Sequence, residues 1–272
     1  MPRPRVLVVS SHVAQGAVGL KATAPPLFHA GCDVIQVPTV VLSNHLGHRH
    51  VAGAAVEAET IARMIDALAA NGALDGLSAI ITGYLPESAH VSAAAQAITK
   101  LTRTPAPPLV VCDPVLGDDP NGLYIPEATA LAIKHELLPL ADVITPNRFE
   151  LAWLTARPVQ SIGDALTAAR DLGIAIVAAT SIPAEKQAIS TLAVSASVSH
   201  SVDVPWRENV PHGTGDLFTG LFTAALVTGQ PIDKALQSST DTLERVIASS
   251  CGAPDLDLGE FFAAPPPGSV MP

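Results

Sequence analysis

Short runs of apolar, β-branched residues alternate along the chain with Ala- and Leu-rich stretches of helical periodicity. Two of the helical stretches cover residues 54–72 and 161–173. The apolar runs predict strands at residues 5–10, 33–43, 78–83, 109–113, 141–145 and 174–180. Strands that alternate with helices form βαβ units, so this pattern predicts an α/β fold with a mainly parallel sheet.

Polar or small residues stand at the carboxyl ends of five of these runs. They are Ser10, Gly83, Asp113, Thr145 and Thr180. Any one of them is explained by a turn or a helix cap. In an open α/β sheet, however, the carboxyl ends of the strands line the ligand crevice, so the five together predict a ligand site along this edge.

Composition limits the classes of protein to consider. The 272 residues are 48% hydrophobic, which is enough for one large domain. A net charge of -10 with only 15 Lys and Arg argues against nucleic acid or an anionic membrane as a partner. The three cysteines are odd in number and far apart, so neither a disulfide framework nor a zinc site is indicated, and a reducing cytoplasm is expected.

No internal repeat or linker divides the sequence. We therefore expect a single domain over residues 1–252. The tail, residues 253–272, ends in APPPGSVMP and is expected to be loosely ordered. No apolar stretch reaches transmembrane length.

Residues 212–229 combine a glycine-containing turn with the start of an apolar helix. Gly213 and Gly215, with Thr214 between them, let backbone N–H groups converge at a helix N-terminus, which predicts an anion hole. Asp216 follows in the first turn, where it could accept a proton from a hydroxyl that attacks a phosphate. A glycine turn with an aspartate favoured by the helix dipole would explain the same residues without a ligand.

Two other segments carry carboxylates near strand ends. Asp113 follows the strand that ends at Cys112, and its loop runs on to Tyr124. A carboxylate here could act on phosphates through a metal ion and its waters, or it could form an Asx turn. Asn147 and Glu150 have the spacing of a capping box. In the functional interpretation, Glu150 instead holds a magnesium-bound water.

These three segments, in this order, resemble the ribokinase-like kinases. The GTGD element of that family supplies an anion hole and a catalytic base, and its DPV and TPNxxE elements line the nucleotide and magnesium site. The resemblance implies a three-layer α/β/α sandwich, ATP as co-substrate, Mg²⁺ as cofactor with K⁺ as a further candidate, and a homodimer. The GxxxxGK[ST] phosphate loop of another large kinase class is missing from the sequence.

The same resemblance assigns roles to individual residues. Asp216 is the implied base. Asp113 and Glu150 are implied to hold Mg²⁺ through water. The residues implied to lie around ATP are Asp113, Tyr124, Thr145, Glu150, Thr180, Ser181 and Thr214. Few family residues can be recognised between 181 and 211, so adenine contacts there stay open.

The N-terminal third resembles the bacterial pyridoxal kinases, in the segments at residues 10–19, 37–45 and 82–85. This resemblance implies ATP-dependent phosphorylation of the 5′-hydroxyl of pyridoxal, with pyridoxine and pyridoxamine as further candidates, in vitamin B6 salvage. It implies that Ser10 hydrogen-bonds the pyridine ring or its hydroxyl, that Thr39 flanks the ring, and that Tyr84 forms a wall. The 5′-hydroxyl would then point at Asp216.

The polar stretch SNHLGHRH, residues 43–50, contains three histidines without the fixed helical spacing of a metal site. We expect residues about 38–52 to form a mobile flap that closes over the substrate. His212, beside the anion hole, could interact with phosphate, although a solvated loop histidine is the simpler interpretation.

Two alternatives stay open. The chain could be a hydroxymethylpyrimidine kinase or act on both kinds of alcohol, although residues 10–19 do not match the GSDSGGGAG-like stretch expected there. It could also be a non-catalytic protein that stores or delivers pyridoxal phosphate, against which the intact GTGD element counts. The sequence does not rank the three B6 vitamers.

Overall fold

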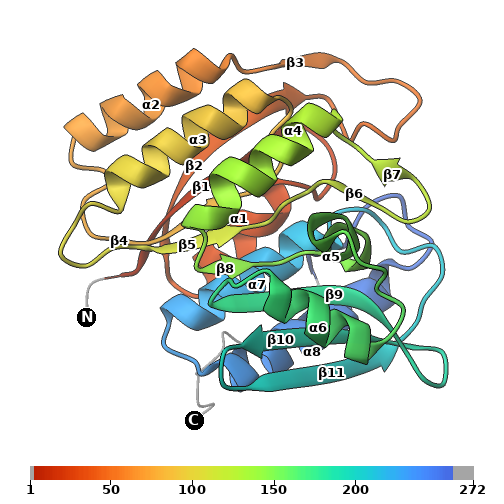
Figure 1. Cartoon of the computed structure of the whole chain (residues 1–272). Helices are drawn as coiled ribbons and strands as arrows, with labels where there is room; N and C mark the ends of the chain where they lie inside the picture. Colours follow the sequence, from red (N-terminus) through yellow and green to blue (C-terminus); the bar gives the residue numbers. More distant parts are fainter. Residues whose placement is uncertain (1–2, 260–272) are drawn as a thin grey trace, which may run out of the picture.

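The computed structural model describes residues 3–259, in which helices and strands alternate as the sequence predicts (Figure 1). The strands are β1 Arg5–Val13, β2 Asp33–Leu42, β3 Gly53–Ala55, β4 Leu77–Thr82, β5 Leu109–Cys112, β6 Gly117–Asp118, β7 Gly122–Leu123, β8 Val143–Ile144, β9 Ile176–Ala184, β10 Ala188–Ser195 and β11 Ser199–Pro205. The α-helices are α1 Leu20–His29, α2 Ala58–Ala70, α3 Ser88–Leu101, α4 Glu127–Ala132, α5 Arg148–Thr155, α6 Ile162–Asp171, α7 Thr214–Val227 and α8 Ile232–Ser250. A π-helical turn, η1 Ile133–Leu137, and a 3₁₀ turn, η2 Leu138–Leu140, continue α4.

The main sheet has nine strands in the order β11-β10-β9-β8-β5-β4-β1-β2-β3. The six strands from β9 to β2 are parallel, and antiparallel strands lie at the edges. β2 and β4 lie on opposite sides of β1, so the strand order reverses there. The carboxyl end of β1 is therefore a topological switch point, where open α/β sheets form their ligand crevice.

Two helical layers cover the sheet and confirm the predicted three-layer α/β/α sandwich (Figure 1). Alternate residues of β1 serve opposite cores: Leu7 and Val9 pack with α2, α3 and the helices that follow, whereas Val6 and Val8 pack with α1, α7 and α8. Because successive side chains of a strand point to opposite faces, a strand buried on both sides must be apolar throughout. The run VLVV in β1 has this composition.

The predicted flap at residues 38–52 needs correction. Residues 38–42 belong to β2, and only 43–52 form a connecting loop before β3. Val40, Val41 and Leu42 pair with β3 in an antiparallel ladder, so their backbone is fixed by the sheet.

The boundary placed at Gly252 is also too early. Leu256 is only 5% exposed and packs into the core formed with α7 and α8. The Oγ atom of Ser250 accepts a hydrogen bond of 2.8 Å from the Asp257 N–H. Residues 253–259 are therefore part of the packed domain, and the rest of the predicted tail, 260–272, lies outside the described residues.

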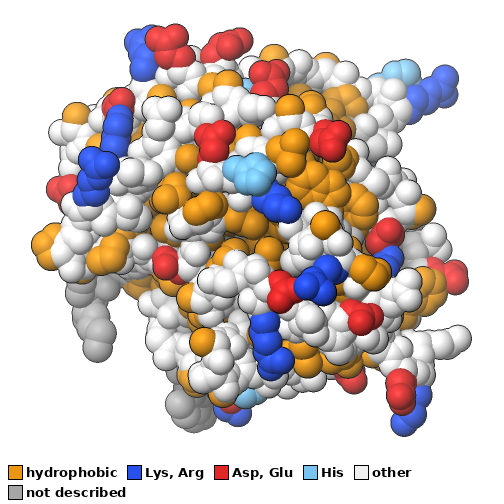
Figure 2. Space-filling view, viewed as in Figure 1, with side chains coloured by type: hydrophobic (Ala, Val, Ile, Leu, Met, Phe, Trp, Pro, Cys, Tyr) orange, Lys and Arg blue, Asp and Glu red, His pale blue; other side chains and the backbone are white. Residues whose placement is uncertain are grey.

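On the face seen in Figure 2, Lys and Arg side chains are scattered among Asp and Glu and form no continuous basic surface. Within residues 3–259, no helix is both long and apolar enough to cross a membrane.

Candidate active site

Four of the five predicted strand-end residues lie in register across the sheet. Val9 pairs with Thr82, Thr82 with Cys112, and Cys112 with Ile144. The next residues along these four strands are Ser10, Gly83, Asp113 and Thr145. The backbone ladder continues into this row, because the N–H groups of Gly83, Asp113 and Thr145 each donate to a neighbouring strand. The row therefore forms one continuous line on β1, β4, β5 and β8, although β1 continues past Ser10 to Val13, so the prediction that Ser10 ends its strand is wrong.

The fifth residue, Thr180, does not belong to this row. The register opposite Thr145 is held by Ala178, because Ile144 pairs with Val177. Thr180 forms an isolated parallel bridge with Asn147, two residues farther along. β9 also continues to Ala184, since it forms an antiparallel hairpin with β10, so Thr180 does not end the strand. Its position in the row is a prediction that the structure contradicts.

Ser181 lies beside Thr180 in a left-handed backbone conformation, with φ of 60°. The β9–β10 ladder shifts register here, between Ser190 and Leu192 on the partner strand, which is typical of a bulge. Because of the bulge, Ser181 does not follow the regular alternation of side chains between the two faces of the strand, and it is exposed. Both residues remain at the β8–β9 end of the edge.

Ser10, Thr39 and Tyr84 come together, as predicted. The Oγ atom of Ser10 accepts a hydrogen bond from the Tyr84 N–H at 3.2 Å, and the Thr39 hydroxyl donates to the Tyr84 carbonyl oxygen at 2.7 Å. Ser10 and Thr39 are 1% and 0% exposed. They hold the backbone of Tyr84, and the Ser10 hydroxyl keeps its proton available to donate elsewhere.

Asp216 lies at the same place, delivered by α7. A methyl group built on Gly83 would lie 2.4 Å from Ser10 Oγ and 4.0 Å from Asp216 Oδ1. Only a residue without a side chain leaves this space open. The gap over Gly83 is therefore bordered by Ser10 on one side and by the Asp216 carboxylate on the other.

The N-terminus of α7 begins directly at the predicted anion hole. Gly213 is its N-cap, with φ of 99°, and Thr214 is its first residue. A Cβ on Gly213 would lie 1.9 Å from the carbonyl oxygen of Ala17, so this loop and residue 17 approach more closely than any side chain allows. First-turn N–H groups of a helix lack intrahelical acceptors, and here they include those of Thr214 and Gly215.

Burial raises the pKa of Asp216 to about 6, and a hydrogen bond from the Gly19 N–H opposes part of that rise. Gly19 is the N-cap of α1, with φ of 55° and its own ideal Cβ position 2.2 Å from the Ser11 carbonyl oxygen. Two helix N-termini thus meet at one carboxylate. The sequence does not predict the contact between Gly19 and Asp216, because no local pattern links these two positions.

Asp113 is 6% exposed, and burial is the main reason why its pKa lies well above the ordinary value. The negative charges of Asp216 and Glu150 raise it further, whereas hydrogen bonds from the Thr219 hydroxyl and the Val115 backbone lower it. Three carboxylates therefore influence one another at the edge of the sheet. A cluster of this kind favours a cation or a proton.

Glu150 and Asn147 form the predicted capping box at the start of α5. Glu150 Oε2 accepts from the Asn147 N–H at 2.8 Å, and Oε1 accepts from the Leu116 N–H at 2.8 Å. Burial nevertheless raises the pKa of Glu150 to about 7. Its carboxylate holds the loop after β5 in place, so direct metal ligation by Glu150 would compete with backbone donors.

The β6–β7 hairpin lies over this loop, with Tyr124 directly after it. The Asn147 side chain donates to the Gly117 carbonyl oxygen at 2.8 Å and ties the hairpin to α5. Tyr124 is 41% exposed, and partial burial, together with a hydrogen bond to Asp118 and the negative charge of that residue, raises the pKa of its hydroxyl. It borders the site from the outside.

Comparison with known proteins identifies the family of this chain. The sequence profile of the phosphomethylpyrimidine kinase family matches residues 20–257. The chain belongs to this family. Among its relatives, a pyridoxine/pyridoxal/pyridoxamine kinase of Bordetella avium is 35% identical over 93% of this chain and 88% of that protein.

Two solved structures have the same fold. A pyridoxal kinase from Entamoeba histolytica superimposes with a TM-score of 0.90 at 27% identity, covering 96% of this chain and 95% of that one. A pyridoxal kinase from Leishmania donovani, in complex with ADP and pyridoxamine, superimposes with a TM-score of 0.87 at 28% identity, covering 94% of each chain.

The loop at residues 43–52 contacts His212, which lies beside the predicted anion hole. The rings of His45 and His212 are stacked, with centroids 4.1 Å apart. Burial and the neighbouring His212 and His48 lower the pKa of His45 to about 4, so its ring is neutral near pH 7. His212 is exposed, as expected for a solvated loop histidine, and its ring also stacks on His45.

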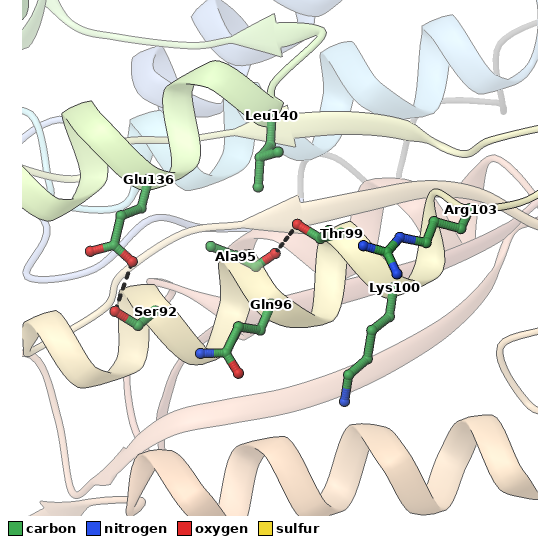
Figure 3. Close-up of a pocket in the computed structure, with 8 residues that line it drawn as sticks. All are labelled: Ser92, Ala95, Gln96, Thr99, Lys100, Arg103, Glu136 and Leu140. Atoms are coloured by element: carbon green, nitrogen blue, oxygen red, sulfur yellow. Dashed lines mark hydrogen bonds between the residues drawn. The ribbon is translucent and has the colours of Figure 1, made fainter.

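A surface groove elsewhere takes no part in this site (Figure 3). It lies between α3 and the η1–η2 segment, where Ser92 donates to Glu136 at 2.7 Å. None of the predicted site residues lines it. α3 begins just after the carboxyl end of β4, and most of the lining residues lie farther along that helix. Among the described residues, no three His, Cys, Asp or Glu side chains are placed to hold a metal ion directly.

Proposed function

We propose that the protein is an ATP-dependent kinase that phosphorylates the 5′-hydroxyl of pyridoxal and of related B6 vitamers. One observation carries the proposal: the Asp216 carboxylate, the N-terminus of α7 and Ser10 converge around Gly83. A base beside an anion hole serves phosphoryl transfer to a hydroxyl. The names of the kinases that this chain resembles supply the substrate class.

The B6 vitamer would lie over the edge formed by Ser10 and Thr39. The Ser10 hydroxyl has a proton to donate to a ring nitrogen or phenolic oxygen, because its oxygen already accepts from Tyr84. Thr39 would act through Tyr84, whose carbonyl oxygen it binds. The 5′-hydroxyl of the vitamer then reaches toward Asp216 across the space left by Gly83.

ATP would lie along the rest of the sheet edge, with its phosphates toward Asp113, Thr145 and Thr214 and its adenine beyond the row, toward Thr180 and Ser181. Asp216 would take the proton of the 5′-hydroxyl as the γ-phosphoryl group is transferred, and the first-turn N–H groups of α7 would stabilise the developing charge. A carboxylate whose pKa is raised to about 6 is ionised near pH 7 yet basic enough to accept that proton.

The carboxylates present fit magnesium held largely by water and phosphate. Mg²⁺ keeps several waters and binds proteins through one or two carboxylates. Asp113 accepts one backbone hydrogen bond, from Val115, besides that of the Thr219 hydroxyl, whereas both oxygens of Glu150 accept from backbone N–H groups. We propose Asp113 as the principal holder, with Glu150 acting through water. When bound, the ion would neutralise phosphate charge. K⁺ and a homodimer stay predictions.

The first test is ADP release with Mg-ATP and each of four alcohols: pyridoxal, pyridoxine, pyridoxamine and hydroxymethylpyrimidine. Turnover is expected on B6 vitamers, and Asp216→Asn should lose about 10²- to 10⁴-fold in kcat because the base is removed. Near-wild-type turnover of this variant would contradict the assignment of Asp216.

The same assay separates the alternatives. A higher kcat/KM on hydroxymethylpyrimidine than on every B6 vitamer would identify the chain as a pyrimidine kinase, in keeping with the name of the family profile. Retention of pyridoxal phosphate with no ADP release from any alcohol would instead identify a carrier.

A further inference from the structure

Thr219 lies one turn beyond Asp216 on α7, and its side chain enters the core beneath the active site. Residues three apart on a helix face the same way, so the surface of α7 that delivers the base also delivers this hydroxyl. Thr219 is 1% exposed. A buried hydroxyl needs a polar partner, and the partners of Thr219 come from two strands of the sheet.

The hydrogen bonds of Thr219 form a directed chain. Its hydroxyl donates to Asp113 Oδ2 at 3.0 Å, and its oxygen lies 2.8 Å from Thr145 Oγ1. The Thr219 hydroxyl donates its single proton to Asp113, so in the contact with Thr145 it can only accept, and Thr145 is the donor.

This chain joins three separate elements. Asp113 follows β5, Thr145 follows β8, and Thr219 is carried by α7. Thr145 is 3% exposed and Asp113 is 6% exposed, so all three groups are shielded from water that could replace the bonds. The link fixes the sheet edge, proposed to face the nucleotide, against the helix that carries Asp216.

The bond also fixes one side of the Asp113 carboxylate. Oδ2 accepts from Thr219, and the carboxylate also accepts from the Val115 backbone. With one of these donors removed, the carboxylate is freer to rotate about its terminal torsion, which is broad in aspartate. The orientation of the group that would meet a hydrated cation therefore depends in part on a residue outside the recognised motifs.

We infer that Thr219 is a positioning residue for phosphoryl transfer: it orients Asp113 toward the metal–nucleotide side and holds α7 in place. This inference rests on the proposed kinase function. Thr223, one turn farther along α7, is a matched comparison. Thr223 is 0% exposed, like Thr219, but its hydroxyl has no hydrogen-bond partner within the described part of the chain.

The experiment compares Thr219→Val, Thr219→Ser and Thr223→Val in the full-length protein. Valine keeps the shape of threonine and removes the hydroxyl, whereas serine keeps the hydroxyl. We expect Thr219→Val to lower kcat about 10- to 100-fold and to raise the Mg²⁺ concentration needed for half-maximal rate, with little change in the KM for pyridoxal. Thr219→Ser and Thr223→Val should each stay within about 3-fold of wild type.

A second measurement does not depend on turnover. Calorimetry of ADP binding with and without Mg²⁺ gives the gain in affinity that the ion provides. Thr219→Val should lose most of this gain, and Thr219→Ser should keep it. If Thr219→Val does not fold, the comparison of Thr219→Ala with Thr219→Ser serves the same purpose.

The outcomes separate this inference from the proposed function. A wild-type protein without turnover on any alcohol overturns the proposed function itself. An active wild type in which Thr219→Val matches Thr223→Val, in kcat and in the effect of Mg²⁺ on ADP binding, overturns only the role of Thr219. A loss of thermal stability alone would mean that the bond is purely structural.

Discussion

The carboxylate of Asp216 is partly buried and lies beside the N-termini of two helices, α1 and α7. Burial is the larger effect, since the pKa rises to about 6 although the Gly19 N–H donates to the carboxylate. The charged form that the proposed chemistry needs is therefore the form that the fold disfavours. Groups of this kind often mark functional sites, because a purely structural carboxylate gains nothing from such a position.

The kinase rate should follow the ionisation of Asp216. Because a protonated carboxyl cannot accept the proton of the substrate, kcat/KM is expected to fall tenfold per pH unit below about pH 6. The measurement is kcat/KM for pyridoxal between pH 5 and 8 at saturating Mg-ATP. A flat profile down to pH 5 would contradict a base with this pKa.

Removing the same charge should stabilise the protein. The raised pKa means that the folded state binds the proton more tightly than the unfolded state, so stability is lost as pH rises from about 4 to about 6. Asp216→Asn should therefore raise the free energy of unfolding at pH 8 by about 1–3 kcal/mol. Urea denaturation at pH 8 and pH 4 tests this, and the gain should vanish at pH 4.

At the scale of elements, the α7 segment packs against the α1 segment so closely that two of its glycines leave no room for a side chain. Gly213 packs on the Ala17 carbonyl oxygen, and an ideal Cβ on Gly220 would lie 2.4 Å from the carbonyl oxygen of Thr23. Backbone-to-backbone packing brings both N-termini to Asp216. The glycines of this segment thus serve helix packing as well as the anion hole.

Gly213 and Gly215 should respond differently to substitution by alanine. Gly213→Ala is expected to lower the free energy of unfolding by about 2–4 kcal/mol, because its φ is 99° and its Cβ would lie 1.9 Å from the Ala17 oxygen. Gly215 has no heavy atom within 4 Å of its ideal Cβ position and lies in the helix. Gly215→Ala should leave stability unchanged or raise it by up to about 1 kcal/mol.

Urea denaturation of both variants makes the comparison. Equal stability of the two would show that α7 can move away from Ala17 at little cost. Gly215→Ala is a control for stability and not for activity, because the N–H of residue 215 belongs to the proposed anion hole.

At the scale of the whole molecule, residues that follow the last helix, α8, complete the hydrophobic core formed with α1, α7 and α8. Leu256 packs beside α7 and α8. Asp255 lies close to the loop between β1 and α1, since an ideal Cβ on Gly16 would lie 2.8 Å from the Asp255 carboxylate. The segment after α8 therefore connects the end of the domain to the loop between β1 and α1, next to the proposed site.

Leu256→Ala should destabilise the protein by about 2–4 kcal/mol, the usual cost of truncating a buried leucine. Leu131, which is 41% exposed on α4, provides the control, and Leu131→Ala should change stability by less than about 1 kcal/mol. Thermal denaturation of both variants measures the difference. Equal melting temperatures would restore the expectation of a loosely held segment after Gly252.

The sequence by itself determined the alternation of strands and helices, the capping box at Asn147 and Glu150, and the row from Ser10 to Thr145. These features rest on local periodicity, capping spacing and strand ends, which a single segment specifies. Parallel strands that end at one edge bring such residues together without further information. The anion-hole segment is likewise local, since two glycines and a helix start lie within four residues.

Only the tertiary structure decided the contacts made across segments. Thr180 falls outside the row because pairing with β10 extends β9 past the edge, and Leu256 is buried because α7 and α8 leave a surface for it. The hydrogen bonds from Gly19 to Asp216 and from Thr219 to Asp113 depend on how closely α7 packs against α1 and the sheet. Register and packing distance are set between elements, so no pattern within one segment contains them.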